Sequence, residues 1–396
     1  MKIYIVGIGM DGVKTLTAEA GKAIESADVL IGAKRVTEPF AALGKPVFEC
    51  WRTDGICEYI SRGRFRTAAV LMSGDCGFFS GAQALVKRLA EYDTEVIAGI
   101  SAPVYLCARL GLPWQDMKLV SLHGADAGIA RNVRGNALCF FLLGGDITPA
   151  DICGRLCEYG MEDITVHIGA RLAYPDERII GGTAKELSEV RCDPLCAVIT
   201  ENPSPEARVR YGIPDGEFLR GEVPMTKAEI RAIIAAKLGV CENDTVWDVG
   251  CGTGSVSVEC ALAASDGTVF AVDKNEQAAA LTERNARKFG CDNIRVYRGN
   301  APGALAELPG PDRLFIGGAN GHIAEILDAA FAEGNSPRTV ITAVSLETLH
   351  EAVTALRDRG FSPEVTQISA VRSRVLGTHT MPDPQDPVFI IEGGAK

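Results

Sequence analysis

Short apolar runs alternate with longer amphipathic stretches along most of the chain. In the first half, runs typical of buried strands occupy residues 3–6, 29–31, 68–72, 95–97, 137–143, 164–168 and 195–200. Stretches with apolar positions at helical spacing separate most of these runs, for example at residues 17–26, 81–92 and 149–159. This alternation predicts an α/β fold for the first half.

The second half alternates more regularly. Its predicted strands are residues 245–249, 268–272, 294–298, 313–316, 339–343, 364–368 and 388–391. Its predicted helices are residues 227–238, 255–264, 276–289, 322–332 and 346–359. We therefore expect a doubly wound, Rossmann-like sheet that ends in an antiparallel hairpin.

A proline-rich passage separates the two halves. It contains Pro203, Pro205, Pro214 and Pro224, and proline at this density resists both helix and central strand. We expect one domain over residues 1–205, a linker over 206–221 and a second domain over 222–396. Two domains agree with a length of 396 residues.

Composition narrows the function classes. A net charge of −11 does not suit a protein that neutralises nucleic-acid phosphates, so we expect no nucleic-acid partner. No apolar run approaches the ~18 residues of a membrane helix, and the first strand leads into a glycine turn. The 13 cysteines include no CxxC pair, which favours free thiols over a metal site. We expect a cytoplasmic homo-oligomer without a membrane segment or a metal.

The strongest chemical signal lies after the strand at residues 245–249. Glycines at 250, 252 and 254 suit a sharp turn that a ligand approaches closely, and the helix that follows directs its first N–H groups at that ligand. The spacing GxGxG differs from the GxGxxG of dinucleotide-binding folds. We therefore expect a nucleotide-like cofactor other than a dinucleotide.

Polar residues around this loop extend the site. Asp248 precedes the first glycine and can fix the loop or a ligand ammonium group. Asp273 ends the next strand and can accept hydrogen bonds from a ribose diol, while Asn300 can offer its amide to an adenine edge. The candidate cofactor-binding residues of this half are Asp248, Gly250, Cys251, Gly252, Thr253, Gly254, Asp273, Asn300 and Ala301.

Three glycine turns follow successive strands in the first half. The first, at residues 7–12, matches GxGxxG, and Lys34 and Arg35 stand where a 2′-phosphate would be bound. However, the strand at 29–31 ends without an acid, and residues 15–17 postpone the helix. Turns at residues 72–79 and 98–102 suggest instead one ligand held by several loops. The candidate residues are Gly7, Gly9, Gly74, Asp75, Gly77, Ser101 and Ala102; His123 is either a cleft residue or a structural histidine.

Both halves resemble known families of methyltransferases. Residues 1–205 resemble the tetrapyrrole methylases in the stretches VGIGMDG, ADVLIGAKR, SGDCGFF, VIAGISAPVYLCARLGLPW, VSLHG and ITENP. Residues 222–396 resemble the decarboxylating corrin methyltransferases in PMTKAEIR, WDVGCGTGSVSVE, AVDKN, GNAPGAL, LFIGGANG, ITAVSLETL and DPVFII. The order of the two halves is that of the fused, bifunctional enzymes of cobalamin biosynthesis.

The resemblance implies a two-subdomain (class III) methylase fold followed by a Rossmann-like class I methyltransferase domain. It implies S-adenosylmethionine as the cofactor of both halves, with Thr226 of the PMTK stretch added to its site. It implies a precorrin substrate, methylated at C5 by the first half and at C15 by the second, which also removes the C12 acetate carboxyl. The candidate substrate-binding residues are Gly317, Gly318, Arg372 and Arg374; no general acid or base is visible.

Two other readings stay open at this level. An NADP-linked oxidoreductase would use the first-half GxGxxG, although the loop at residue 250 lacks that spacing. Alternatively, one half is inactive and serves as a ligand-binding scaffold. The sequence does not distinguish a metal-free precorrin from its cobalt-loaded equivalent.

Overall fold

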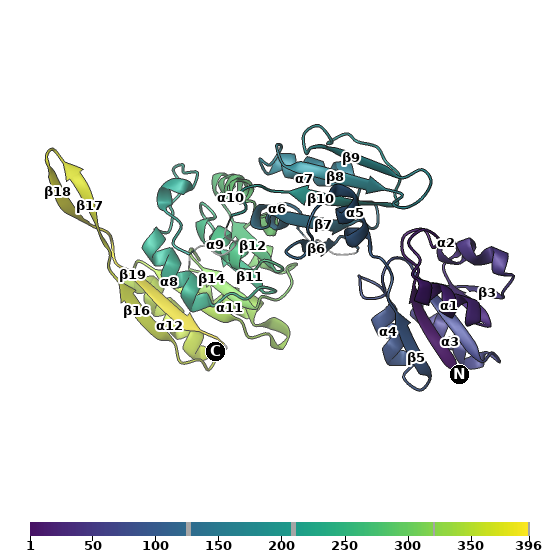
Figure 1. The fold of residues 1–396 in the computed structure, drawn as a ribbon. Coiled ribbons are helices and arrows are strands. Elements are labelled where there is room, and N and C mark those ends of the chain that lie inside the picture. Colours follow the sequence, from purple (N-terminus) through teal and green to yellow (C-terminus); the bar gives the residue numbers. More distant parts are fainter. Residues whose placement is uncertain (124–127, 207–210, 320, 395–396) are drawn as a thin grey trace. The chain divides into compact units, whose positions relative to one another are not determined.

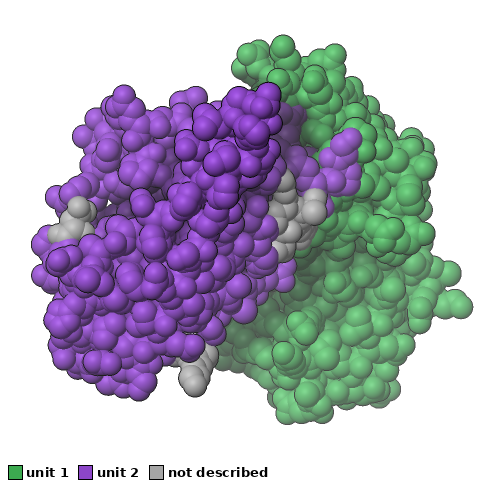
Figure 2. Space-filling model, turned by 90° about the vertical axis from the view of Figure 1, so that its left-hand side faces the viewer, with its two compact units in different colours: residues 1–127, 136–157, 162–203 green, residues 128–135, 158–161, 204–396 purple. Residues whose placement is uncertain are grey.

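The computed structural model describes residues 1–123, 128–206, 211–319 and 321–394. The chain forms two compact units (Figure 2). Unit 1 comprises residues 1–127, 136–157 and 162–203, and unit 2 comprises residues 128–135, 158–161 and 204–396. Each unit is built on its own sheets.

Unit 1 begins with a fully parallel five-stranded sheet in the order β3-β2-β4-β1-β5. Its strands are β1 (Lys2–Gly7), β2 (Val29–Gly32), β3 (Val47–Glu49), β4 (Thr67–Met72) and β5 (Asp93–Ile97). One face is covered by α1 (Ala18–Ser26) and α2 (Lys34–Thr37), the other by α3 (Thr53–Arg62) and α4 (Ala82–Arg88). A 3-10 helix spans Glu38–Leu43. Apolar residues on both faces explain the nearly continuous hydrophobic runs of these strands.

The second sheet of unit 1 is mixed, with the order β6-β7-β10-β8-β9. Its strands are β6 (Lys118–Ser121), β7 (Leu138–Leu142), β8 (Thr165–Ala170), β9 (Arg178–Thr183) and β10 (Cys196–Glu201). The helices of this stretch are α5 (Ala102–Leu110), α6 (Ala130–Gly135, assigned to unit 2) and α7 (Pro149–Glu158). Strands β3, β6 and β9 are short or half-exposed and carry no continuous apolar run, so the sequence pattern did not predict them.

Unit 2 is a seven-stranded, doubly wound sheet in the order β13-β12-β11-β14-β15-β19-β16 (Figure 1). Its strands are β11 (Thr245–Val249), β12 (Thr268–Asp273), β13 (Ile294–Arg298), β14 (Arg313–Ile316), β15 (Arg338–Ala343), β16 (Glu364–Ile368) and β19 (Val388–Gly393). Only β19 runs antiparallel to its neighbours. The expected Rossmann-like α/β architecture is confirmed.

Helices cover both faces of the unit 2 sheet. One core contains α8 (Ala228–Leu238), α9 (Ser255–Ala263) and α10 (Glu276–Lys288), and the other contains α11 (Ile323–Ala330) and α12 (Leu346–Asp358). Short 3-10 helices span Asp215–Glu217, Gly303–Leu305 and Ala332–Gly334. Trp247 and Phe315, on neighbouring strands, lie in opposite cores because successive side chains of a strand point to opposite faces.

The end of the chain contains a hairpin that the sequence pattern did not predict. Strands β16 and β19 pair antiparallel as expected, but a separate two-stranded hairpin, β17 (Val371–Leu376) and β18 (His379–Pro384), is inserted between them. The hairpin projects from the sheet in Figure 1. Arg372 and Arg374 both lie on β17, beyond the end of the main sheet.

The proline-rich segment, where the structure describes it, packs on unit 2. Ile213 and Phe218 are buried in its core, and the backbone N–H groups of Gly212 and Ile213 donate to Glu259 at 3.1 and 3.0 Å. Residues 207–210 of the expected linker lie outside the described residues. The chain from residue 204 onward belongs to unit 2.

All 13 cysteines are free, as expected, and most are buried among apolar side chains. Among the described helices, none is both long and apolar enough to cross a membrane.

Candidate functional site

A cavity of about 1280 Å³ opens at the carboxyl ends of the parallel strands of unit 2. It is lined by the loops that follow β11, β12, β13, β14 and β15, and by residues 223–227 before α8. Ligands of open α/β sheets bind at this edge, next to the point where the strand order reverses, which here is β11. The volume exceeds the range of a typical small-molecule pocket, so it can hold a cofactor together with a second, larger ligand.

The glycine loop after β11 forms one wall of the cavity. Gly250, Gly252 and Gly254 have φ values of +80°, +57° and +73°, in the left-handed region that favours glycine. A Cβ atom on Gly250 would lie 2.6 Å from the backbone nitrogen of Gly318, so the loops after β11 and β14 touch through backbone alone. Helix α9 begins directly after Gly254, which places its free N–H groups at the loop.

Asp273 links this loop to the end of β12. Its carboxylate accepts hydrogen bonds from the backbone N–H of Gly252 (3.0 Å) and of Asn275 (2.9 Å), one on each oxygen. Each carboxylate oxygen has a second lone pair, so both can accept a further hydrogen bond from the cavity. This arrangement fits a ribose diol.

Asp248 is buried away from the cavity. Its side chain is fully buried, and one oxygen accepts a hydrogen bond from Ser257 of α9. The other oxygen has no partner among the described residues. Burial raises the pKa of Asp248 to about 7, partly offset by the Ser257 hydrogen bond. Asp248 therefore supports the loop from within the core and does not line the site.

The structure brings most of the predicted unit 2 residues together. Those that line the cavity are Thr226, Gly250, Cys251, Gly252, Asp273, Asn300, Ala301, Gly317 and Gly318. Thr253 and Gly254, like Asp248, are outside its lining. Thr253 is buried, and Asn285 of α10 donates to its carbonyl oxygen at 2.9 Å. Sequence reasoning missed Lys227 and His322, which also line the cavity; the signal for Lys227 was its place in the PMTK stretch.

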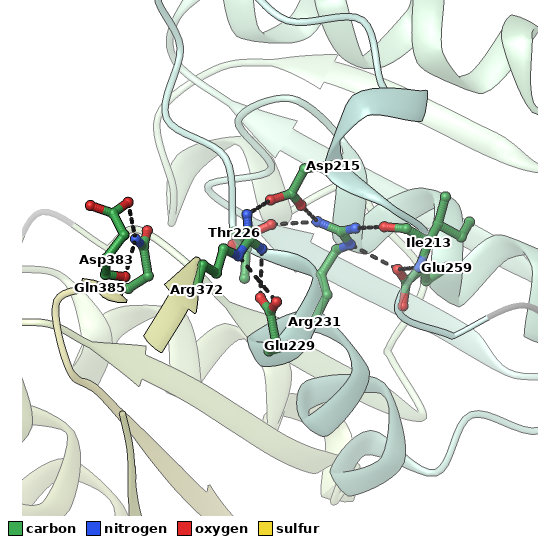
Figure 3. Close-up of polar contacts among 9 residues, drawn as sticks. All are labelled: Ile213, Asp215, Thr226, Glu229, Arg231, Glu259, Arg372, Asp383 and Gln385. Atoms are coloured by element: carbon green, nitrogen blue, oxygen red, sulfur yellow. Dashed lines mark hydrogen bonds and ion pairs between the residues drawn. The ribbon is translucent and has the colours of Figure 1, made fainter. Parts of the chain in front are cut away.

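Arg372 and Arg374 do not line the cavity. The guanidinium of Arg372 donates two hydrogen bonds to Glu229 (3.1 and 2.5 Å) and forms an ion pair with Asp215 at 2.9 Å (Figure 3). The hydrogen bonds from Arg372 lower the pKa of Glu229. Arg374 is exposed and lies 3.4 Å from Asp383 across the hairpin. Arg372 thus ties the base of β17 to the start of α8.

Arg231 continues the same network into the core. It is fully buried and donates to Glu259 (2.8 Å), to Asp215 (3.1 Å) and to the carbonyl oxygens of Thr226 and Ile213 (Figure 3). Removing one member of a buried charge pair typically costs about 3–5 kcal/mol. The network therefore fixes residues 213–231, including the wall of the cavity.

In unit 1 the three glycine turns touch one another. Gly9 and Gly74 exchange both backbone hydrogen bonds, at 3.1 and 2.7 Å. A Cβ atom on Gly99 would lie 2.1 Å from the carbonyl oxygen of Gly74. Asp75 accepts hydrogen bonds from the N–H groups of Gly77 and Gly99, at 2.8 and 2.9 Å. The candidate residues Gly7, Gly9, Gly74, Asp75 and Gly77 are thus brought together, with Ser101 and Ala102 at the start of α5 beside them.

The first of these turns does not have the geometry of a dinucleotide loop. Asp11 accepts hydrogen bonds from the backbone N–H groups of Val13, Lys14 and Thr15, and α1 begins only at Ala18, with Thr17 as its N-cap. The helix that follows the GxGxxG match in the chain, α1, therefore does not begin at the turn. Lys34 and Arg35 belong to the short helix α2. The ring of His123 lies against Gly144, where a Cβ atom would be 2.4 Å from it.

Fold and site together define unit 2 as a Rossmann-like methyltransferase domain, with six parallel strands, one antiparallel strand and a glycine loop that opens onto the cavity. A model of the precorrin methyltransferase domain matches residues 217–392, and a model of the tetrapyrrole (corrin/porphyrin) methylases matches residues 2–188.

Three known proteins illustrate the similarity. A probable cobalt-precorrin-6B C(15)-methyltransferase (decarboxylating) of Pyrobaculum calidifontis is 47% identical over 183 residues, which cover 46% of this chain and 94% of the relative. A precorrin-6Y C(5,15)-methyltransferase [decarboxylating] of Sinorhizobium is 29% identical over 98% of this chain and 94% of its own length. The crystal structure of a precorrin-6y C5,15-methyltransferase from Geobacter metallireducens is 36% identical, with a TM-score of 0.44, covering 46% of this chain and 95% of that one. This chain belongs to the precorrin methyltransferases.

Proposed function

We propose that the chain methylates a precorrin at two carbons, C5 and C15, and removes the carboxyl group of its C12 acetate, in cobalamin biosynthesis. In this proposal unit 2 performs the C15 methylation and the decarboxylation, and unit 1 performs the C5 methylation. The observation that carries it is the unit 2 cavity, whose lining combines a glycine loop, a ribose-type carboxylate and room for a second large ligand. The Sinorhizobium relative, whose name states both methylations, supports it over nearly the whole chain.

We propose S-adenosylmethionine as the cofactor of both units. In unit 2 the residues fit it: Gly250 and Gly252, which carry no Cβ atom, line the cavity, Asp273 has free lone pairs for a diol, and Asn300 lines the same cavity. When bound, this cofactor supplies an electrophilic methyl group. The protein's own task is to orient the acceptor carbon, since correct positioning accounts for a large part of such rate enhancements.

No triad of catalytic side chains is required by this chemistry. The macrocycle supplies the nucleophilic carbon and accepts the electron pair that decarboxylation releases. Free cysteines are typical of a reducing compartment, so we place the reaction in the cytoplasm. Assembly into a homo-oligomer stays a prediction.

The test is to incubate the intact protein with labelled S-adenosylmethionine and either metal-free or cobalt-loaded precorrin. Mass spectrometry should count two added methyl groups and one carbon dioxide per ring. The two substrates separate the metal-free route from the cobalt route, both of which are represented among the names of the relatives. A ring that returns with no added methyl group from both incubations contradicts the proposal.

Separate fragments test the division of labour. A C-terminal fragment should begin at residue 204, because Ile213 and Phe218 are part of the unit 2 core. The Pyrobaculum calidifontis relative matches 46% of this chain over 94% of its own length. We therefore expect a fragment of this size to fold alone. We expect it to release carbon dioxide and add one methyl group. If it folds and binds the cofactor but releases no carbon dioxide, the decarboxylation has been assigned to the wrong part of the chain.

A further inference from the structure

The carboxylates of a precorrin need cationic partners, and the two arginines expected to supply them lie elsewhere. Among the described residues, the basic side chains that line the cavity are Lys227, Lys274 and His322. His322 lies 3.6 Å from Glu325, and Lys274 is exposed next to Asp273. Lys227 is half-buried, and within the described part of the chain no carboxylate is paired with it. It is thus the lining cation with the strongest need of an anionic ligand.

The backbone on both sides of Lys227 is fixed. Before it, the carbonyl oxygen of Thr226 accepts a hydrogen bond from the buried Arg231. After it, Glu229 receives both hydrogen bonds from Arg372 (Figure 3). Lys227 is also the N-cap residue of α8, where the helix leaves the cavity wall. Two arginines, one in the core and one on β17, therefore hold this lysine at the cavity.

Apart from Thr226, which the resemblance to known methyltransferases adds to the cofactor site, the groups suited to the cofactor come from other loops. The glycine loop follows β11, Asp273 follows β12 and Asn300 follows β13, whereas Lys227 lies on the segment that precedes the sheet. A cation on a separate wall can bind a second ligand without displacing the first. Its position and its lack of a partner are both explained by an acidic second ligand.

We propose that Lys227 binds a carboxylate of the tetrapyrrole substrate in the unit 2 cavity, with Arg231 and Arg372 acting as positioning residues. This inference rests on the proposed function of unit 2. An ammonium–carboxylate hydrogen bond is among the stronger polar contacts in proteins, and it would satisfy the half-buried lysine only when substrate is bound. Arg372, expected to contact substrate itself, acts through Glu229 instead.

The test measures substrate and cofactor separately in the full-length protein. In Lys227→Met, the KM for precorrin, followed by carbon dioxide release, should rise at least about tenfold, the loss expected for one charged hydrogen bond. The Kd for S-adenosylmethionine, measured by calorimetry, should stay within about twofold of wild type. Lys227→Arg should restore most of the substrate affinity. Lys22→Met is the matched control, since it removes the same charge at an exposed lysine that does not line the cavity.

A double-mutant cycle tests the positioning role. Arg372→Met should raise the KM for precorrin by roughly threefold, and Lys227→Met combined with Arg372→Met should be no worse than Lys227→Met alone, because both act through one contact. Additive losses would show that Arg372 acts independently of Lys227.

An unchanged KM for precorrin in Lys227→Met would overturn the inference. If the Kd for S-adenosylmethionine were at the same time tenfold weaker, Lys227 would be assigned to the cofactor instead. The wild-type protein is assayed in parallel. If it does not turn over precorrin, the proposed function is contradicted, and the inference fails with it.

Discussion

The two units use glycine at strand ends for different purposes. In unit 1, Gly7 and Gly99 are needed because three backbone turns touch one another, with a Cβ on Gly99 falling 2.1 Å from the carbonyl oxygen of Gly74. In unit 2, the loop beginning at Gly250 also touches its neighbours, with a Cβ on Gly250 falling 2.6 Å from Gly318 and one on Gly252 falling 2.9 Å from Pro224. Its exposed side, however, lines a cavity, and the loop leads directly into α9. Similar sequence patterns therefore form a packed junction of three turns in unit 1 and the wall of an open cavity in unit 2.

The comparison shows what a glycine motif alone conveys. A strand followed by GxGxxG predicts a phosphate site only if a helix N-terminus follows directly. Asp11 closes the first turn of unit 1 with three backbone hydrogen bonds, and the helix starts six residues after Gly12. The structure that follows the last glycine is thus a better indicator of a phosphate site than the spacing of the glycines.

The largest expected effect is on the packed junction. Gly99→Ala should destabilise unit 1 by about 3 kcal/mol, because the new methyl group overlaps backbone atoms that cannot move aside cheaply. For a domain of this size that corresponds to a melting temperature lower by roughly 5–10 °C. Scanning calorimetry should show the shift in one transition, while the transition of unit 2 and its binding of S-adenosylmethionine stay unchanged.

Gly154→Ala is the control, because a Cβ on Gly154 in α7 meets no atom within 4 Å. It should be neutral or slightly stabilising. Equal destabilisation by Gly99→Ala and Gly154→Ala would contradict the packed-junction interpretation.

The next effect concerns two aspartates that hold corresponding loops. Asp273→Ala removes the acceptor for Gly252 N–H and the expected acceptor for a ribose diol. Losing hydrogen bonds to a charged group costs about 1.5–3 kcal/mol, so the affinity of unit 2 for S-adenosylmethionine should fall at least about tenfold. Isothermal calorimetry measures this change, and C5 methylation should continue.

Asp75→Ala is the counterpart in unit 1, where Asp75 accepts from Gly77 and Gly99. It should lower the stability of unit 1 and leave cofactor binding by unit 2 intact. Loss of both methylations in Asp273→Ala, with the fold preserved, would argue against two independent sites.

The sequence indicated which unit 2 residues come together at the cavity, because these residues follow strands. Strand β11 and the glycines after it are local features, and parallel strands bring Asp273, Asn300 and Gly317 to one edge. The same reasoning left two roles open for Asp248, in the loop or at a ligand, because the direction of its side chain, toward the cavity or toward Ser257, depends on packing against α9.

Local sequence patterns contain no information on contacts between residues that are far apart in the chain. Arg372 meets Asp215 and Glu229, which are more than 140 positions earlier in the chain. The proline-rich segment was expected to be a linker because proline disfavours regular structure, but Ile213 and Phe218 pack into the core without forming a long helix or a strand. A segment without long helices or strands can therefore still be part of the core of a domain.

The last expected effect distinguishes the loop aspartates by the pH dependence of stability. Hydrogen bonds from Lys14, Val13 and Thr15 lower the pKa of Asp11 despite its burial, whereas burial raises the pKa of Asp248 to about 7. A carboxyl whose pKa is higher in the folded protein contributes stability that is complete below its unfolded value, near 4, and is lost as pH rises through 7. Unit 2 should therefore lose up to about 1.4 kcal/mol of stability per pH unit from this group between about pH 4 and 7.

Asp248→Asn should remove that pH dependence of stability, measured by urea unfolding at pH 5 and pH 8. Ser257→Ala should move the loss of stability to higher pH, since the Ser257 hydrogen bond lowers the pKa of Asp248. Asp11→Asn should leave the slope above pH 5 unchanged, because Asp11 is already ionised there in both states. Identical slopes in wild type and Asp248→Asn would mean that the buried carboxyl titrates normally, and the contrast between the two loops would then be one of backbone packing alone.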